Sequence, residues 1–440
     1  MKDLRNADRF LSHLESLFSV TFEDARAIIG HFHQEMRYGL AGEESSLKML
    51  PSFVGRPQGT EKGQFLALDL GGTNFRVLAV ALDGKGHAAI ASVCKVAIPQ
   101  ELMQGACDGL FDFIADSIQA FFREHRLSQQ QAYALAFTFS FPVEQSSIAS
   151  GKLIEWTKGF TASGVEGRDV VVLLSEALKR RELGFIRVAA LANDTVGTLV
   201  AGSYAEPSCD MGVILGTGTN ACYPEKAARI RKRPELEACG EIIVNTEWGN
   251  FDKLKTNVYD RLLDGASRNA GRQRLEKMVS GMYLGEIARR VIVEMTGQGL
   301  LFEGKGQAAF AGEYALTAEH LSMLSGGSDI FAGLGLADVS AADGQAIREI
   351  GRIVSTRSAR ITGAAIAAVI TWMDAHLEVG HTVAIDGSLF EKYPGYQDAM
   401  RLLLQDLFGN RAARIKLELV RDGSGIGSAI IGAVAASSRC

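Results

Sequence analysis

A short glycine-rich pattern occurs twice in this chain, and the repetition constrains the fold more than any other feature. Residues 70–74 read Leu-Gly-Gly-Thr-Asn and residues 216–220 read Gly-Thr-Gly-Thr-Asn, each after a short apolar run. The two copies lie far too far apart for a solenoid of stacked repeats. We therefore interpret them as two α/β halves, each with a glycine turn at a strand end, and we expect a cleft between the halves.

The segments around the first turn alternate between strand and helix patterns. Apolar runs at 65–70 and 75–82 flank the turn, which indicates strand, turn, strand. Apolar residues at helical spacing predict a helix that includes 110–121, and further apolar runs predict strands over 133–139 and 186–192. We also expect helices over about 168–183 and 194–203. Such alternation favours an α/β fold whose sheets are covered by helices.

Composition excludes several classes of protein. With 440 residues the chain is expected to form more than one domain. Its 47% hydrophobic and 22% charged residues exclude disordered, collagen-like and coiled-coil chains. The net charge of -5 argues against nucleic acid or an anionic membrane as the main partner.

The chain shows no targeting or membrane signal. Its longest apolar stretches fall short of the roughly 20 residues of a bilayer span, and its charged amino terminus lacks the apolar core of a signal peptide. We therefore expect no transmembrane helix and a cytoplasmic location. The six cysteines have no C-x-x-C spacing, which favours reduced thiols and no structural metal.

Both glycine turns are candidate polyphosphate sites. Backbone N–H groups reach phosphate oxygens only where no side chain blocks them, and Thr and Asn add donors. One copy alone would be explained as well by an ordinary hairpin, whereas two copies favour the phosphate interpretation. P-loop and Rossmann strings are absent from the sequence. Asp69, at the strand end before the first turn, could orient Mg²⁺ through water or could cap the turn.

Three other side chains are candidates for chemistry on a sugar hydroxyl. Asp194 follows a strand and opens a helix, so it could cap that helix or accept a proton from a hydroxyl that attacks phosphorus. Lys158 could stabilise charge on a transferred phosphoryl group or be an ordinary exposed lysine. Glu247, beside Trp248, could bind vicinal hydroxyls or be a surface carboxylate next to a core tryptophan.

Three further segments have open interpretations. Asp-Gly-Ser at 386–388 and Asp-Gly-Ser-Gly-Ile-Gly at 422–427 could both open onto a nucleotide. The second could equally be a flexible joint that bends beside the ligand. The basic stretch 226–235 is interpreted as a solvated charged face rather than a binding patch.

In their order along the chain, these motifs resemble those of the hexokinases, of the single-unit ATP-dependent hexokinase/glucokinase type. The resemblance covers about residues 65–436, and each motif is weak alone while their order is specific. The matching segments are 68–77 (LDLGGTNFRV), 137–142 (FTFSFP), 156–160 (WTKGF), 193–196 (NDTV), 216–223 (GTGTNACY), 245–249 (NTEWG), Glu276 with 280–286 (SGMYLGE), 386–388 (DGS) and 423–425 (GSG).

The resemblance implies an actin-like (ribonuclease H-like) two-domain sugar kinase with a cleft between a small and a large domain. The small domain would comprise 63–190 plus 424–440, and the large domain 1–62 plus 191–423. The activity implied is ATP-dependent phosphorylation of a hexose, glucose above all, at the 6-hydroxyl, with closure of the domains on sugar binding. ATP and Mg²⁺ would be needed, with Mg²⁺ held through ATP and water near Asp69 rather than in a protein metal site.

The resemblance also assigns roles to residues. Asp194 would be the general base and Lys158 would steady the transferring phosphoryl group. The side chains that would bind the sugar are Ser140, Thr157, Lys158, Asn193, Asp194, Asn220, Glu247 and Glu276. The residues that would bind the nucleotide are Asp69, Gly71, Gly72, Thr73, Asn74, Arg76, Gly216, Thr217, Gly218, Thr219, Gly387, Ser388 and Ser424.

Two features depart from the family pattern, and two other functions stay open. Thr219 stands where glucokinases commonly carry cysteine, and residues 302–336 match the family poorly. A non-catalytic sugar sensor on the kinase fold would bind sugar without turnover. An actin-like ATPase would hydrolyse nucleotide regardless of sugar, and it would leave Glu247 and Glu276 without a role.

Overall fold

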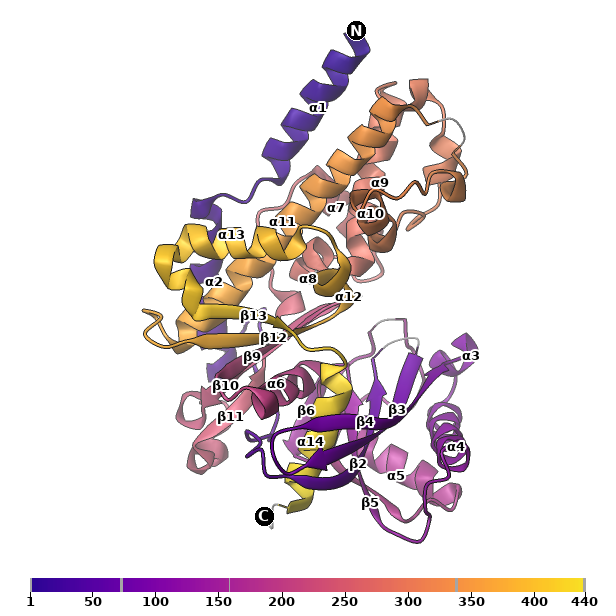
Figure 1. The fold of residues 1–440 in the computed structure, drawn as a ribbon, viewed down its shortest axis with the longest axis vertical. Coiled ribbons are helices and arrows are strands. Elements are labelled where there is room, and N and C mark those ends of the chain that lie inside the picture. Colours follow the sequence, from indigo (N-terminus) through magenta and orange to yellow (C-terminus); the bar gives the residue numbers. More distant parts are fainter. Residues whose placement is uncertain (1, 72–73, 158, 337–338, 438–440) are drawn as a thin grey trace.

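The computed structural model describes residues 2–71, 74–157, 159–336 and 339–437. Its strands form two main sheets that lie in two lobes (Figure 1). We call the part built on the five-stranded sheet the small lobe and the part built on the six-stranded sheet the large lobe. A separate hairpin of β6 (Val143–Ser147) and β7 (Ser150–Leu153) contacts the small lobe through β8 and faces β1 of the large lobe.

The small-lobe sheet has the strand order β4, β3, β2, β5, β8. Strands β2, β3 and β4 are antiparallel neighbours, whereas β5 runs parallel to β2 and β8 runs parallel to β5. Their bounds are β2 Lys62–Leu70, β3 Asn74–Asp83, β4 Ala88–Ala97, β5 Tyr133–Phe139 and β8 Ile186–Ala192. The strands predicted around the first turn and at 133–139 and 186–192 are therefore confirmed.

The large-lobe sheet repeats this plan. Its bounds are β1 Leu50–Pro51, β9 Cys209–Leu215, β10 Thr219–Lys226, β11 Glu241–Asn245, β12 His381–Asp386 and β13 Ile415–Leu419, in the order β1, β11, β10, β9, β12, β13. Apart from the edge strand β1, the two sheets have the same strand order. When the five strands of each sheet are numbered along the chain, they lie side by side in the order third, second, first, fourth, fifth. In both, the first two strands form an antiparallel hairpin closed by a glycine turn, and the last two run parallel to the first. The two predicted α/β halves are thus confirmed.

Helices cover both faces of the small-lobe sheet. On one face lie α4 (Cys107–Glu124) and α5 (Val170–Arg180), preceded by the short α3 (Gln100–Met103). Asp169 begins α5 by accepting the N–H of Val171 at 2.8 Å, so this helix starts slightly later than predicted. The other face packs against α14 (Gly423–Ser437), which also crosses α6 (Asp194–Ala205) (Figure 1).

The remaining helices build the large lobe around the most extensive hydrophobic core. They are α1 Lys2–Phe18, α2 Phe22–Ala41, α7 Val258–Ala266, α8 Arg274–Val279, α9 Gly281–Gly297, α10 Ala318–Ser325, α11 Ala341–Met373, α12 Ser388–Lys392 and α13 Tyr396–Phe408. Short 3₁₀ turns fill the connections, namely η1 Ala227–Arg229, η2 Pro234–Cys239, η3 Trp248–Asn250, η4 Phe302–Gly304, η5 Gln307–Phe310, η6 Ala332–Leu334 and η7 Gly409–Arg414.

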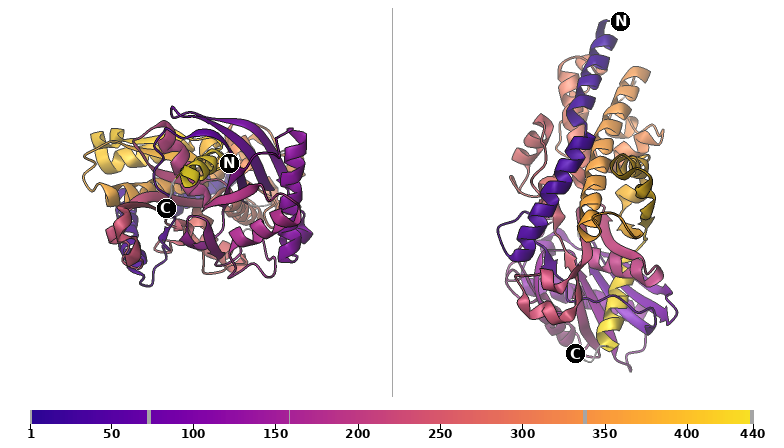
Figure 2. Two further views of the ribbon diagram at one scale, coloured as in Figure 1. Left: turned by 90° about the horizontal axis from the view of Figure 1, so that it is seen from below. Right: turned by 90° about the vertical axis from the view of Figure 1, so that its left-hand side faces the viewer.

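Helix α11 is the one helix in the described ranges that is long and apolar enough to cross a membrane. Its apolar window is 89% buried inside the protein, and α1 and α2 run alongside it (Figure 2). The apolar composition of α11 is therefore accounted for by its place in the core of the large lobe.

The lobes meet where α14 crosses α6. A Cβ atom at Gly427 would lie 1.7 Å from the carbonyl oxygen of Gly197, so the two helices touch backbone to backbone. Residues 423–427, interpreted from sequence as a candidate flexible joint, instead form the first turns of α14. Their glycines serve close helix packing at the junction of the lobes.

The basic stretch 226–235 is a solvated face only in part. Lys232 folds back so that its Nζ donates to the carbonyl of Lys48 at 2.6 Å, and burial lowers the pKa of Lys232 to about 8. Arg233 donates to the carbonyl of Gln145 at 3.2 Å. The sequence-based interpretation is wrong for these two residues, because charge content does not show that a loop turns back onto the protein.

Candidate active site

A cluster of amide and carboxylate side chains lies where β8 and β11 end and β10 begins. Asn220 Nδ2 lies 2.9 Å from Asn245 Oδ1, 3.1 Å from Glu247 Oε1 and 3.4 Å from Asn193 Oδ1. Asn245 Nδ2 donates to the same Glu247 oxygen at 2.7 Å. Glu247 has a left-handed backbone, with φ of 54°, in the sharp turn after β11. The structure thus brings together three predicted sugar ligands, Asn193, Asn220 and Glu247.

Asn245 is a member of this cluster that sequence reasoning missed. It was part of the matching segment 245–249 but had no assigned role. Its position as the last residue of β11, directly before the turn that carries Glu247, was the available signal.

Asp194 is the first residue of α6 and stands beside this cluster. The helix is capped by Asn193, whose Oδ1 accepts the Thr195 N–H at 3.0 Å and the Thr195 hydroxyl at 2.6 Å. Asp194 Oδ1 accepts the same N–H at 2.9 Å, and its Oδ2 has no hydrogen-bond partner among the described residues. Because Asn193 already caps the helix, capping does not account for the Oδ2 atom of Asp194.

Glu276, on α8, contacts the second glycine turn. Its Oε2 accepts the Thr219 N–H at 3.1 Å, and the Thr219 hydroxyl accepts the indole N–H of buried Trp248 at 3.0 Å. The polar groups of Thr219 are therefore engaged within the protein. In contrast, the N–H groups of Thr217 and Gly218 donate no hydrogen bond to any residue that the structure describes. The second turn thus offers two backbone donors to an anion.

Asp69, at the end of β2, holds a cluster that links the lobes. Its Oδ2 accepts from Arg76 Nη2 at 2.5 Å and from the Ser424 hydroxyl at 3.0 Å, and Arg76 also pairs with Asp422. Whether Asp69 also caps the first turn stays open, because Gly72 and Thr73 lie outside the described residues. Ser424, at the start of α14, therefore lies against the first turn region.

Asp386 approaches the same serine from the large lobe. The Ser424 N–H lies 3.4 Å from Asp386 Oδ2. Burial raises the pKa of the Asp386 carboxyl to about 6, and the nearby charge of Asp69 acts in the same direction. The next residue, Gly387, has φ of 135°, and a Cβ atom there would lie 2.2 Å from the Leu215 carbonyl oxygen at the second turn. The regions of both turns therefore converge on Ser424 and Asp386.

The other predicted ligands are placed as follows. Ser140 lies beside the first turn, where its N–H donates to the Leu70 carbonyl at 3.0 Å and a Cβ atom on Gly71 would meet its hydroxyl at 3.6 Å. Thr157 is half-buried after Trp156, and no contact between described residues places it in the Asn220 cluster. Asn74 begins β3 and Ser388 begins α12. The predictions for Gly72, Thr73 and Lys158 lie outside the described residues.

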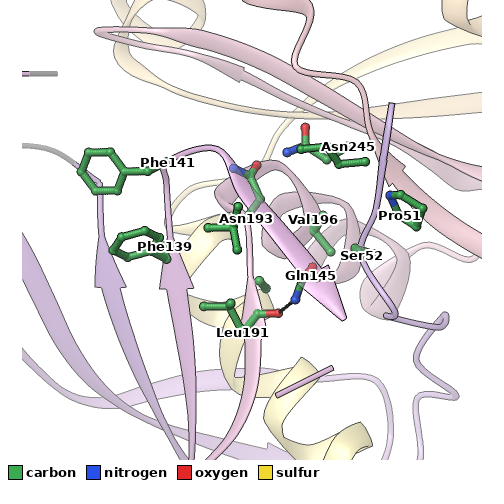
Figure 3. Close-up of a pocket in the computed structure, with 12 residues that line it drawn as sticks. Pro51, Ser52, Phe139, Phe141, Gln145, Leu191, Asn193, Val196 and Asn245 are labelled. Atoms are coloured by element: carbon green, nitrogen blue, oxygen red, sulfur yellow. Dashed lines mark hydrogen bonds between the residues drawn. The ribbon is translucent and has the colours of Figure 1, made fainter. Parts of the chain in front are cut away.

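A small cavity lies next to the Asn220 cluster (Figure 3). It is lined by Asn193 and Asn245 together with apolar side chains that include Phe139, Phe141 and Val196. Gln145 closes another side and donates to the Leu191 carbonyl at 2.8 Å. The cavity has a volume of about 20 Å³, which suits a water molecule and is too small for a sugar ring.

Comparisons with known proteins agree on one family. Two hexokinase family models match, one over residues 10–204 and one over residues 210–434, so each contains one glycine turn. The chain is 42% identical over 422 residues to the chloroplastic hexokinase-4 of Oryza sativa subsp. japonica, and the match covers 90% of this chain and 83% of the relative.

An animal relative and a solved structure give the same result. The chain is 40% identical to hexokinase HKDC1 of Mus musculus over 96% of its length, and it spans about half of that longer relative (47%). The solved hexokinase from Schistosoma mansoni, complexed with glucose, matches with a TM-score of 0.89 at 34% identity and covers 97% of this chain and 99% of its own.

Proposed function

This chain belongs to the hexokinase family, and from that premise we propose that it phosphorylates glucose at the 6-hydroxyl with Asp194 as general base. Hexose phosphorylation follows from the family itself. The choice of glucose, the identity of the base and the closing of the lobes are our proposals. The observation that carries them is the Asp194 carboxylate, which stands beside the Asn220 cluster and whose Oδ2 is not used by the helix cap that Asn193 provides.

The polar cluster suits a neutral polyol. Amide and carboxylate groups offer both donors and acceptors, and a sugar hydroxyl can use each kind at once. Asn220 and Glu247 are already held in place by their mutual contacts at 3.1 Å, so a bound sugar would meet preorganised partners. We propose that they fix the ring and so decide which hydroxyl faces phosphorus. Thr157, Ser140 and Glu276 would complete the site at its borders.

The chemical step is an in-line transfer. Asp194 takes the proton of the sugar 6-hydroxyl, the 6-oxygen forms a bond to the γ-phosphorus of ATP, and the bond from that phosphorus to the bridging oxygen of ADP breaks. The products are hexose 6-phosphate, ADP and a protonated Asp194, which then releases its proton. By the family resemblance Lys158 would stabilise the charge on the phosphoryl group.

The phosphate groups of ATP would lie between the two turns. On one side, the N–H groups of Thr217 and Gly218 have no acceptor within the described ranges, and on the other side Asp69, Ser424 and Asp386 converge. Mg²⁺ prefers oxygen ligands and keeps several waters, so the carboxylates of Asp69 and Asp386 fit an ion that reaches them through water. That ion would neutralise charge on the phosphate oxygens.

Turnover of Asp194→Ala tests the proposal. Loss of the general base should reduce glucose-dependent ADP production at least about 100-fold. Glucose binding, followed by tryptophan fluorescence, should persist. Asp398→Ala, on the exposed face of α13, removes an equivalent carboxylate remote from the site and should leave turnover unchanged.

The same assay separates the alternatives. Turnover of Asp194→Ala within about tenfold of the parent would remove this residue from the role of base. A parent protein that binds glucose without producing ADP would be a sensor. We also propose a cytoplasmic location, which subcellular fractionation would test.

A further inference from the structure

Glu155 connects the β6–β7 hairpin to the large lobe. It follows β7, which contacts β8 of the small lobe, and its carboxylate pairs with two cations of the large lobe. Oε1 lies 3.2 Å from Lys48 Nζ, and Oε2 lies 3.0 Å from Arg272 Nη1. Each carboxylate oxygen therefore has its own partner, so Lys48 and Arg272 do not compete for the same oxygen.

Each of these three residues belongs to a segment that carries a proposed sugar ligand. Glu155 is two residues before Thr157, and Arg272 is four residues before Glu276. Lys48 is two residues before β1, which pairs with the end of β11, next to Glu247. The ion pairs thus join three walls of the same site, contributed by different parts of the chain.

Local hydrogen bonds hold these segments firmly enough to transmit the attraction. Lys232 Nζ donates to the Lys48 carbonyl at 2.6 Å and ties that segment to the loop after β10. The N–H of Trp156, between Glu155 and Thr157, donates to Glu166 Oε1 at 2.8 Å. The ion pairs of Glu155 therefore act on a fixed backbone segment that also carries Thr157.

We propose that Glu155 is a positioning residue for the sugar. Its ion pairs with Lys48 and Arg272 hold the walls of the site together and so raise the affinity for the hexose. This role rests on the proposed function. The side chains of Glu155 and Lys48 are 37% and 24% exposed, so their pair is screened less than a fully exposed one, whereas Arg272 is 69% exposed and contributes less.

We call the ion pairs of Glu155 with Lys48 and Arg272 the tether. The tether should affect KM rather than kcat. The pairs are made whether the bound sugar is in its ground state or in the transition state, and such uniform binding energy changes KM alone. Because the pairs are partly solvated, salt should weaken them and mimic their removal.

The main test is Glu155→Gln, which keeps the shape and removes the charge. We expect the Kd for glucose, from tryptophan fluorescence, and the KM to rise about three- to tenfold, with kcat within about twofold. The KM of the parent should rise between about 50 mM and about 500 mM salt, whereas that of the variant should not. Glu124→Gln, at the exposed end of α4, removes an equal charge from the same lobe and should match the parent.

Charge reversal separates a tether from damage to the fold. Glu155→Lys should raise KM more than Glu155→Gln, because it places like charges beside Lys48. Adding Lys48→Glu to Glu155→Lys should restore part of the affinity, which a misfolded variant could not do. The proposal is overturned if Glu155→Gln keeps the Kd and salt dependence of the parent, or if it lowers kcat at unchanged KM. A parent protein without turnover would contradict the proposed function instead. The Kd for glucose of parent and variant would still test whether Glu155 supports sugar binding.

Discussion

Asn220 shows how much one amide organises at this site. Its Nδ2 group faces three acceptor oxygens, at 2.9, 3.1 and 3.4 Å. Asn220→Asp would replace that donor by a fourth acceptor with negative charge beside Glu247. We expect the KM for glucose to rise about 10- to 100-fold, through repulsion and unpaired polar groups.

Steady-state kinetics with glucose would measure this effect. Asn6→Asp makes the same chemical change on the exposed side of α1 and should leave KM unaltered. A KM for Asn220→Asp within about twofold of the parent would show that the cluster takes no part in binding the sugar.

His381 is a second residue with a defined expectation, because carboxylates flank both of its ring nitrogens. Nδ1 lies 2.6 Å from Asp210 Oδ2, and Nε2 lies 3.3 Å from Asp374 Oδ2, at the buried start of β12. The hydrogen bond to Asp210 raises the pKa of His381 above its usual value of 6.5. The charged imidazolium therefore stabilises the folded protein.

The sign of the pH dependence follows from this shift. Because the folded pKa is raised, the stabilisation is fully present below about pH 6.5 and is lost as pH rises through the folded pKa. We expect His381→Gln to lower Tm more at pH 6 than at pH 9, as followed by circular dichroism. A Tm difference that stays constant or grows with pH would contradict this assignment.

At the scale of elements, the crossing of α6 and α14 is the most demanding contact. Gly427→Ala would place a methyl group 1.7 Å from the Gly197 carbonyl oxygen, and backbone cannot move aside as a side chain can. We expect a loss of about 3 kcal/mol or more in stability, seen as a lower Tm and a lower yield of folded protein. Gly30→Ala in α2 meets nothing within 4 Å and should be neutral or slightly stabilising. Equal Tm values for the two variants would contradict close packing at this crossing.

The elements were also what the sequence predicted best. The strands around both glycine turns follow from local apolar patterns, and the repeated pattern led to the repeated sheet plan. The glycines of 423–427 were harder to interpret from sequence. A glycine-rich segment is typical both of a helix that packs closely on another backbone and of a flexible joint. Only contact with Gly197, far away in the sequence, distinguishes them.

For the whole molecule, sequence reasoning and resemblance named most members of the candidate site but not how they are held. The Ser424 hydroxyl on Asp69 and the pairing of Glu155 with Arg272 join residues that are remote along the chain. Periodicity reports only on near neighbours, so such contacts carry no local signal. The capping of α6 by Asn193 was also missed, although it decides what Asp194 is free to do.

The two-lobed architecture leads to one expectation for the intact enzyme. Water is a nucleophile at about 55 M, so a site that is always assembled would hydrolyse ATP wastefully. Here the candidate phosphate turns and the proposed sugar ligands come from both lobes, and residues such as Glu155 and Arg76 connect the lobes. Sugar that binds between the lobes should therefore complete the site by drawing the walls together and excluding solvent.

We expect ADP production without sugar to be at least about 1,000-fold slower than at saturating glucose, since correct alignment is lost. A coupled assay for ADP with and without glucose measures this ratio, and a ratio within about tenfold would indicate an ATPase that ignores sugar and would rule out closure as the gate.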